Sequence, residues 1–182
     1  MRIALSGSAG TGKTTLGHAL AESLDLPFVE EGMRERIDAG LAPATLTAEA
    51  YEDLIESLWD EQREREGSHA NGFVADRSPI DFAAFWLHYG SLHDRQRTDH
   101  RMRAWLEELS RYDRIVLLPW GVLPLEDDGV RSTDRWLQFR FQAIVEGLHR
   151  RHTLAPRLLV VPDELTELED RRAWVLERVD AD

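Results

Sequence analysis

Short apolar runs alternate with longer amphipathic stretches along most of this 182-residue chain. The apolar runs have the length and the residue types of buried strands. The amphipathic stretches repeat apolar side chains every three or four residues, which is the spacing of a helix that packs through one face. Because strands that alternate with helices form parallel sheets covered on both faces, the pattern predicts an α/β fold.

The same pattern gives the positions of the elements. We expect strands at residues 2–6, 27–30, 72–76, 114–118 and 157–161. We expect helices at residues 14–24, 31–39, 46–66, 79–89, 98–111 and 134–150. Residues 119–133 form an irregular stretch, and a long loop inside a compact domain is usually a binding loop or a lid. No linker divides the sequence, so residues 1–182 are expected to form a single domain with a lid at about residues 119–135.

Composition narrows the possible function classes. With 42% hydrophobic and 31% charged residues, the chain is expected to bury a substantial core. The absence of cysteine excludes disulfides, thiolate metal sites and cysteine nucleophiles. A net charge of −12 argues against nucleic acid as a partner, because such binding needs a basic face. No apolar stretch has the length of a membrane span and no signal-like segment is visible, so we expect a cytoplasmic monomer or homodimer with no membrane partner.

The only lysine of the chain, Lys13, lies at the end of a glycine-rich loop. Residues 7–14 read Gly-Ser-Ala-Gly-Thr-Gly-Lys-Thr and match the phosphate-binding loop (P-loop) pattern G-x-x-x-x-G-K-[ST]. The loop follows an expected strand and precedes an expected helix, which is the context that the motif requires. A glycine turn that merely joins strand to helix is the alternative. We expect phosphates to be bound by Gly7, Ser8, Ala9, Gly10, Thr11, Gly12, Lys13, Thr14 and Thr15.

Within this loop two side chains have distinct expected tasks. Lys13 should contact the β- and γ-phosphates of ATP, and the Thr14 hydroxyl should ligate Mg²⁺. A GTPase would also need an Asn/Thr-Lys-x-Asp motif, which a chain whose only lysine is in the P-loop cannot contain. The signature of transporter-type ATPases is absent as well. The remaining class is that of small kinases, with ATP and Mg²⁺ as cofactors.

Further motifs resemble those of known kinases. The run Asp76-Arg77-Ser78-Pro79 resembles the Asp/Glu-Arg-Ser motif of deoxynucleoside kinases. Together with residues 31–35 (Glu-Gly-Met-Arg-Glu) and 128–131 (Asp-Gly-Val-Arg), it makes the chain similar to the small ATPase/kinase family that includes the ribosylnicotinamide kinase domain. This resemblance implies a P-loop NTPase three-layer sandwich, with a five-stranded parallel sheet in the order 2-3-1-4-5, helices on both faces and a lid.

Acidic and basic residues at the ends of expected strands are candidates for the site. Asp76 is placed to hold Mg²⁺, directly or through water, with a helix cap as the alternative. Arg77 has the planar fork to clamp a phosphate or the acceptor oxygen, with a structural ion pair as the alternative. Glu30 and Glu31 close the second strand and point to opposite sides of it. We favour Glu31, through the resemblance and its place nearest the loop, as the group that binds or deprotonates the acceptor hydroxyl.

Arginines of the expected lid complete the candidate site. Arg131 and Arg135 are four residues apart at the start of a helix and can reach phosphates from one face when the lid closes. The alternative is that they pair with Asp127, Asp128 or Asp134.

Aromatic residues are abundant, and most are expected to pack in the core. Trp59, Trp105 and Trp136 lie on helical stripes or at their edges, where packing between helix and sheet is the plain interpretation. Candidates for stacking on a nucleobase are Phe82, Phe85 and Trp86, because their helix begins at the Asp-Arg-Ser-Pro run. The seven histidines show no metal-ligand spacing and are expected to be surface or structural residues.

The sequence therefore predicts an ATP-dependent kinase that transfers the γ-phosphoryl group to a small-molecule acceptor. A nucleoside or a ribosylnicotinamide-like compound is the leading acceptor. A nucleoside monophosphate or a non-nucleoside alcohol is an alternative within the enzyme class. A nucleotide-dependent ATPase regulator without a second substrate is the alternative from another class.

Overall fold

The computed structural model describes residues 1–124 and 134–179, and these residues contain a five-stranded parallel sheet. The strand order is β2-β3-β1-β4-β5, and each neighbouring pair runs parallel. This result confirms the expected P-loop NTPase fold class and its 2-3-1-4-5 order. The strands are β1 (Arg2–Ser6), β2 (Phe28–Val29), β3 (Phe73–Asp76), β4 (Arg114–Leu117) and β5 (Leu158–Val160).

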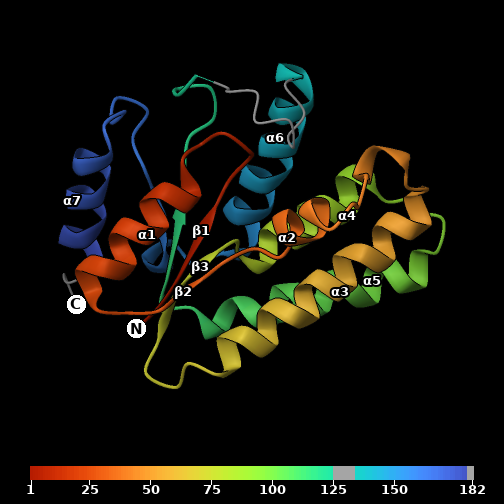
Figure 1. Ribbon diagram of the computed structural model, residues 1–182, viewed down its shortest axis with the longest axis horizontal. Coiled ribbons are helices and arrows are strands. Elements are labelled where there is room, and N and C mark those ends of the chain that lie inside the picture. Colours follow the sequence, from red (N-terminus) through yellow and green to blue (C-terminus); the bar gives the residue numbers. More distant parts are fainter. Residues whose placement is uncertain (125–133, 180–182) are drawn as a thin grey trace.

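Helices follow the strands, and most lie where the sequence places them (Figure 1). They are α1 (Lys13–Leu24), α2 (Met33–Asp38), α3 (Ala48–Gly67), α4 (Pro79–Tyr89), α5 (Arg95–Glu108), α6 (Arg135–His152) and α7 (Leu168–Val179). The last of these, α7, was not predicted. The expected start of α5 at Thr98 is wrong by about one turn, because the Asp94 side chain accepts a hydrogen bond from Arg97 N at 2.9 Å and caps the helix earlier.

The strands distribute their side chains between two helical layers. Ile3 and Leu5 on β1 pack with Leu16 of α1 and with Val175 and Val179 of α7. The helices α1 and α7 therefore cover one face of the sheet, where they lie side by side in Figure 1. The period-two alternation of β1 sends the intervening residue to the opposite face, as expected for a strand buried on both sides.

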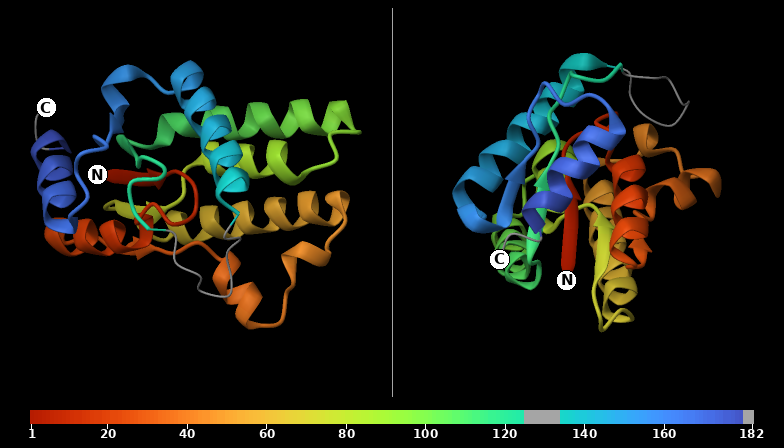
Figure 2. Two further views of the ribbon diagram at one scale, coloured as in Figure 1. Left: turned by 90° about the horizontal axis from the view of Figure 1, so that it is seen from above. Right: turned by 90° about the vertical axis from the view of Figure 1, so that its left-hand side faces the viewer.

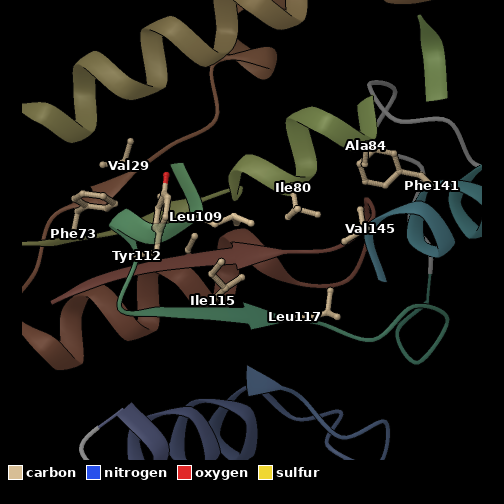
Figure 3. Packing of buried hydrophobic residues seen from close by; sticks show 12 residues of the cluster. Val29, Phe73, Ile80, Ala84, Leu109, Tyr112, Ile115, Leu117, Phe141 and Val145 are labelled. Carbon is tan, nitrogen blue, oxygen red and sulfur yellow. The ribbon is translucent and has the colours of Figure 1, made fainter. Parts of the chain in front are cut away.

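The opposite face is covered by α4 and α6. Figure 3 shows Ile80 and Ala84 of α4 and Phe141 and Val145 of α6 in one cluster with side chains of the sheet. A further cluster joins α4 to α3 and α5, and the left view of Figure 2 shows these two helices on either side of α4, extending beyond the sheet. Among the described residues, no helix is both long and apolar enough to cross a membrane.

The carboxyl ends of the strands bring candidate site residues together. Because all strands run parallel, the carboxyl ends of β1, β2 and β3 lie along one edge of the sheet, where α/β folds bind ligands. The P-loop leaves this edge after Ser6, Glu31 follows β2, and Arg77 follows β3. Ser78 caps α4 in a capping box with Asp81, which fixes the turn that carries Arg77.

Candidate active site

A cavity of about 800 Å³ opens at the carboxyl ends of β1, β2 and β3. One side is formed by the P-loop and the first turn of α1, and the other by side chains of α2, α3, α4 and α6. Its lining includes Lys13, Thr14, Glu31, Asp76 and Arg77, so the structure brings together five of the residues that the sequence singled out. A cavity of this volume has the size of a small-ligand site.

Glycines shape the backbone of the P-loop. Gly7, Gly10 and Gly12 have φ angles of +133°, +76° and +86°, which side-chain-bearing residues rarely adopt. Gly12 is the N-cap of α1 and provides no side-chain cap, so the first turn of the helix faces the cavity with its backbone N–H groups. This arrangement is that of a helix N-terminus that binds an anion.

The Lys13 ammonium is almost completely buried beside the cavity and donates a hydrogen bond to Ser8 O at 2.6 Å. Burial lowers its pKa to about 7, and the nearby Arg77 cation adds to this effect. The carboxylates of Asp76, Asp81 and Glu31 oppose the shift. An anion that enters the cavity would stabilise the charged form of Lys13 and raise its pKa.

Thr14 and Asp76 meet at the base of the same space. The Thr14 hydroxyl donates to Asp76 Oδ2 at 2.5 Å, while Asp76 Oδ1 is buried and has no hydrogen-bond partner among the described residues. A hydroxyl and a carboxylate with an oxygen to spare are the oxygen ligands that Mg²⁺ takes beside phosphates, so the residues fit this ion. Asp76 does not cap α4, since that position belongs to Ser78. The described residues contain no cluster of three or more acidic, histidine or cysteine ligands.

Arg77 has an unusual backbone conformation, with a φ of +109°. Its N–H donates to Leu5 O at 3.1 Å, and its carbonyl accepts a hydrogen bond from Gln62 Nε2 at 3.0 Å. Such a conformation persists only where surrounding contacts hold it, and it is concentrated at functional sites. The strain directs the buried guanidinium of Arg77 towards the cavity and the P-loop.

The Arg77 guanidinium joins two carboxylates to the P-loop. Its Nη1 donates to Gly7 O at 2.9 Å and lies 3.3 Å from Asp81 Oδ1, and its Nε lies 3.2 Å from Glu31 Oε2. Although burial alone would lower the pKa of Arg77, Glu31, Asp81 and Asp76 raise it, so the cation is held firmly. Arg77 is thus both an ion-pair residue and part of the cavity wall.

Glu30 and Glu31 point in different directions. Glu31 lines the cavity and pairs with Arg77, and only 17% of its side chain is exposed. Glu30 is 59% exposed and lies 3.6 Å from His18 Nε2 on the outside of the molecule. The two carboxylates therefore point apart as expected, although β2 ends at Val29 and both residues lie beyond the strand.

An aromatic wall closes the half of the cavity opposite the P-loop. Tyr51 and Tyr89 contact one another with ring centroids 4.6 Å apart, and Phe85 and Phe141 do so at the same distance. All four residues line the cavity. Burial raises the pKa of Tyr51, and the neighbouring Tyr89 and Glu31 raise it further, so its hydroxyl stays protonated.

Of the three candidates for stacking on a nucleobase, only one lines the cavity. Phe85 lines the cavity, whereas Phe82 and Trp86 are fully buried against α3 and α5. These two side chains fall on the face of α4 that points to the helices rather than to the site. Trp136 was expected to pack in the core, but 70% of it is exposed, because it sits on the first turn of α6 above the sheet.

Of the two lid arginines, Arg131 lies outside the described residues, as do Asp127 and Asp128. Arg135 is exposed, its guanidinium lies over the rings of Trp120 and Trp136, and it is not among the described residues that line the cavity. Asp134 accepts hydrogen bonds from the backbone N–H groups of Trp136 and Leu137 and caps α6.

Several residues that contact the P-loop were not predicted from the sequence. Asp81 is completely buried and accepts hydrogen bonds from Ser6, Gly7, Arg77 and Ser78. Its only sequence signal was the Ser78-x-x-Asp81 spacing of a capping box. Also missed were Gln138 and Gln142 of α6 and Arg171 of α7, which bind the P-loop backbone and have no motif of their own.

Comparison with known proteins places the chain in a family. The family model described as an AAA domain matches residues 2–171, so the chain belongs to the AAA domain family. No curated protein matches the sequence.

Solved structures show the same fold. NadR protein in complex with NR has a TM-score of 0.75 at 24% identity, over 97% of this chain and 50% of that one. Deoxyadenosine kinase from M. mycoides has a TM-score of 0.72 at 12% identity, over 100% and 99% of the two chains. Shikimate kinase from Aquifex aeolicus has a TM-score of 0.55 at 17% identity, over 99% and 96%. The chain spans half the length of NadR, and at these identities the likeness shows a P-loop kinase fold.

Proposed function

We propose that this AAA domain protein is a kinase that uses ATP and Mg²⁺ to phosphorylate a hydroxyl group of a small, ring-bearing metabolite. One observation supports the proposal most directly: the P-loop lysine and the Glu31–Arg77 pair face a single cavity from two sides. Phosphoryl transfer needs a nucleotide site and an acceptor site in contact, with cations around the transferred group.

At the nucleotide side, Lys13 and the P-loop N–H groups after Ala9 would hold the phosphates, because the N–H groups of Gly7, Ser8 and Ala9, which were also expected to bind them, already donate to protein side chains. Thr14 and Asp76 would hold Mg²⁺, which neutralises charge on the β- and γ-phosphate oxygens. The spare oxygen of Asp76 supports this assignment. Arg135 is proposed to approach the phosphates only after a rearrangement at the start of α6, since Gln138, three residues later, already lines the cavity.

At the acceptor side, Glu31 would orient the attacking hydroxyl and accept its proton as the new P–O bond forms and the bond from the γ-phosphorus to the ADP oxygen breaks, so that ADP leaves. Arg77 would hold Glu31 in place and offer its guanidinium to the transferred group. Because the pair is nearly buried, both charges act in a weakly screened environment, where electrostatic contributions to the transition state are largest.

Charge and shape of the acceptor half favour a nucleoside or a ribosylnicotinamide-like compound over a nucleoside monophosphate. Arg77 is already paired with Glu31 and Asp81, so it would offer less positive charge to a second phosphate on the acceptor than an unpaired arginine would. Aromatic side chains instead offer faces for a planar ring. NadR is seen in complex with NR, and the M. mycoides protein is a deoxyadenosine kinase. A non-nucleoside alcohol remains the alternative acceptor.

The test is ADP production from ATP and Mg²⁺ with panels of nucleosides, nucleoside monophosphates and other alcohols. We expect at least one nucleoside-like compound to accelerate ADP release and to appear as its phosphate by mass spectrometry. Lys13→Ala should abolish this activity in a protein that still unfolds in one cooperative transition, and Lys13→Arg should fail as well, because a planar guanidinium does not replace a compact ammonium.

The rival is a nucleotide-dependent regulator that has no second substrate. Slow ATP hydrolysis that no compound of the panels accelerates would favour it. A Lys13→Ala protein with most of the parent turnover would contradict the kinase proposal.

A further inference from the structure

Three successive backbone N–H groups at the start of the P-loop are bound by side chains from other elements. The donors and acceptors are Gly7 N to Asp81 Oδ1 at 3.1 Å, Ser8 N to Gln142 Oε1 at 2.8 Å, and Ala9 N to Gln138 Oε1 at 3.2 Å. Two of these acceptors are amides one turn apart on α6. The position of the first residues of the loop is therefore fixed by α6, a helix that is distant from the loop in the sequence.

Gln142 lies where the sheet ends between β1 and β4. Beyond the two strands the pairing continues with one bond, from Leu118 N to Ser6 O at 3.0 Å, and then the P-loop turns away. The Gln142 amide fills the gap, since its Oε1 accepts from Ser8 N and its Nε2 donates to Leu118 O at 3.1 Å. One buried side chain thus satisfies a donor and an acceptor that would otherwise be left without partners.

The approach at this point is close. A Cβ atom on Gly7 would lie 3.0 Å from Leu118 O and 3.4 Å from Gln142 Oε1, so the loop passes both groups with no space for a side chain. Gln142 itself is fixed, because its Nε2 also donates to Glu146 Oε1 at 2.8 Å and because the neighbouring Val145 is fully buried against the sheet. A shift of this amide would shift the first residues of the loop.

We propose that Gln142, supported by Gln138, is a positioning residue that holds the P-loop in the conformation that binds phosphates. Preorganised donors bind an anion more tightly than donors that must first be ordered. The inference rests on the proposed function only in requiring that the P-loop binds a nucleotide. It requires no acceptor.

The test compares two buried positions of α6 that are three residues apart. Gln142→Met keeps the length of the side chain but removes both hydrogen bonds to the backbone, and Val145→Ala removes packing only. We expect both to lower the melting temperature, but only Gln142→Met to weaken the binding of ADP with Mg²⁺ in calorimetry, by roughly tenfold. In turnover assays of Gln142→Met, the KM for ATP should rise by a larger factor than the factor by which kcat falls.

If Gln142→Met does not fold, Gln138→Met takes its place, with an expected loss of affinity of about threefold, since one hydrogen bond to the P-loop backbone is removed. Parental affinity in the folded glutamine variant, or an equal loss in Val145→Ala, would overturn the inference. Parent protein that binds ADP without phosphorylating any acceptor would contradict the proposed kinase and leave this inference in place. Failure of the parent protein to bind ADP would overturn both.

Discussion

At the scale of single residues, Arg77 links the two halves of the cavity. Its guanidinium contacts Glu31 on the acceptor side and Gly7 O on the P-loop side. Its backbone is held at a φ of +109° by hydrogen bonds to Leu5 and from Gln62. A residue with a Cβ atom in such a conformation costs roughly 1–3 kcal/mol, which the surrounding contacts must offset.

The strain at Arg77 gives a prediction that separates backbone from side chain. Arg77→Ala and Arg77→Gly both remove the guanidinium, and both should lose acceptor phosphorylation. Glycine adopts positive φ without a steric penalty, so Arg77→Gly should be the more stable of the two by about 1 kcal/mol, even though glycine increases the entropy of the unfolded chain. Urea unfolding without nucleotide measures the difference. Equal stabilities, or a more stable alanine variant, would contradict the claim of strain.

Site residues that belong to short contiguous motifs could be predicted from the sequence. The P-loop, Asp76 and Arg77 stand in motifs, and the alternation expected at the end of β2 gave the correct directions for Glu30 and Glu31, although the strand itself ends at Val29. Gln142 gave no signal, because its position opposite the P-loop arises only when α6 packs on the sheet. A glutamine on a helix surface and a glutamine that completes a sheet have the same appearance in a sequence.

At the scale of elements, α6 carries a second buried polar group that faces the start of the P-loop. His149 is fully buried, with Nε2 2.8 Å from the Ser6 hydroxyl and Nδ1 2.9 Å from the Thr153 hydroxyl. Burial lowers its pKa to about 4 from an ordinary value of 6.5, against the opposing charge of Asp81. The folded protein therefore keeps this imidazole neutral.

This shift predicts how α6 responds to acid. Because the folded pKa lies below the unfolded one, the contribution of His149 is fully present above pH 6.5 and is lost as the pH falls towards 4. The loss corresponds to about 3 kcal/mol. We expect His149→Gln, which cannot be protonated, to lose less unfolding free energy than the parent protein between pH 6.5 and 4.

Urea unfolding at several pH values tests this prediction. Burial and the nearby Arg140 also lower the pKa of His88 to about 4. Because His88 is present in both proteins, its contribution to the pH dependence cancels when the two are compared. The same pH dependence in parent and His149→Gln would show that His149 is not the titrating group.

The helix α7 could not be predicted from the sequence, because its apolar pattern is interrupted. Its buried positions include Arg171, Val175 and Val179, so a charge interrupts the apolar stripe at its first buried position. Arg171 donates to Leu165 O and, at 2.9 Å, to Thr11 O of the P-loop, while its Nη2 is buried with no hydrogen-bond partner among the described residues, and no sequence pattern indicates these contacts. The sequence indicated the other helices, although α2 has no buried residue and α5 has only Trp105 buried.

At the scale of the whole molecule, distant parts of the chain build the two sides of the cavity. The P-loop side comes from β1 and α1, and the acceptor side comes from the segment between β2 and α4, with α6 closing both. Under the proposed function, a molecule with a net charge of −12 would bind phosphates through a few buried cations placed at one edge of its sheet. Changes on the acceptor side should therefore affect transfer without affecting nucleotide affinity.

Glu31 and Glu30 provide a matched pair for this expectation, since replacing either with glutamine changes the total charge equally. Glu31→Gln keeps the size of the side chain but cannot accept a proton, so we expect turnover to fall by roughly a hundredfold or more. Its affinity for ADP with Mg²⁺ should stay within about twofold of the parent value, because the P-loop contacts are unchanged. Glu30→Gln should match the parent in both measurements, because Glu30 lies outside the cavity. An inactive Glu30→Gln beside an active Glu31→Gln would assign the acceptor to the other carboxylate, and full activity in both would place the proton acceptor elsewhere in the cavity.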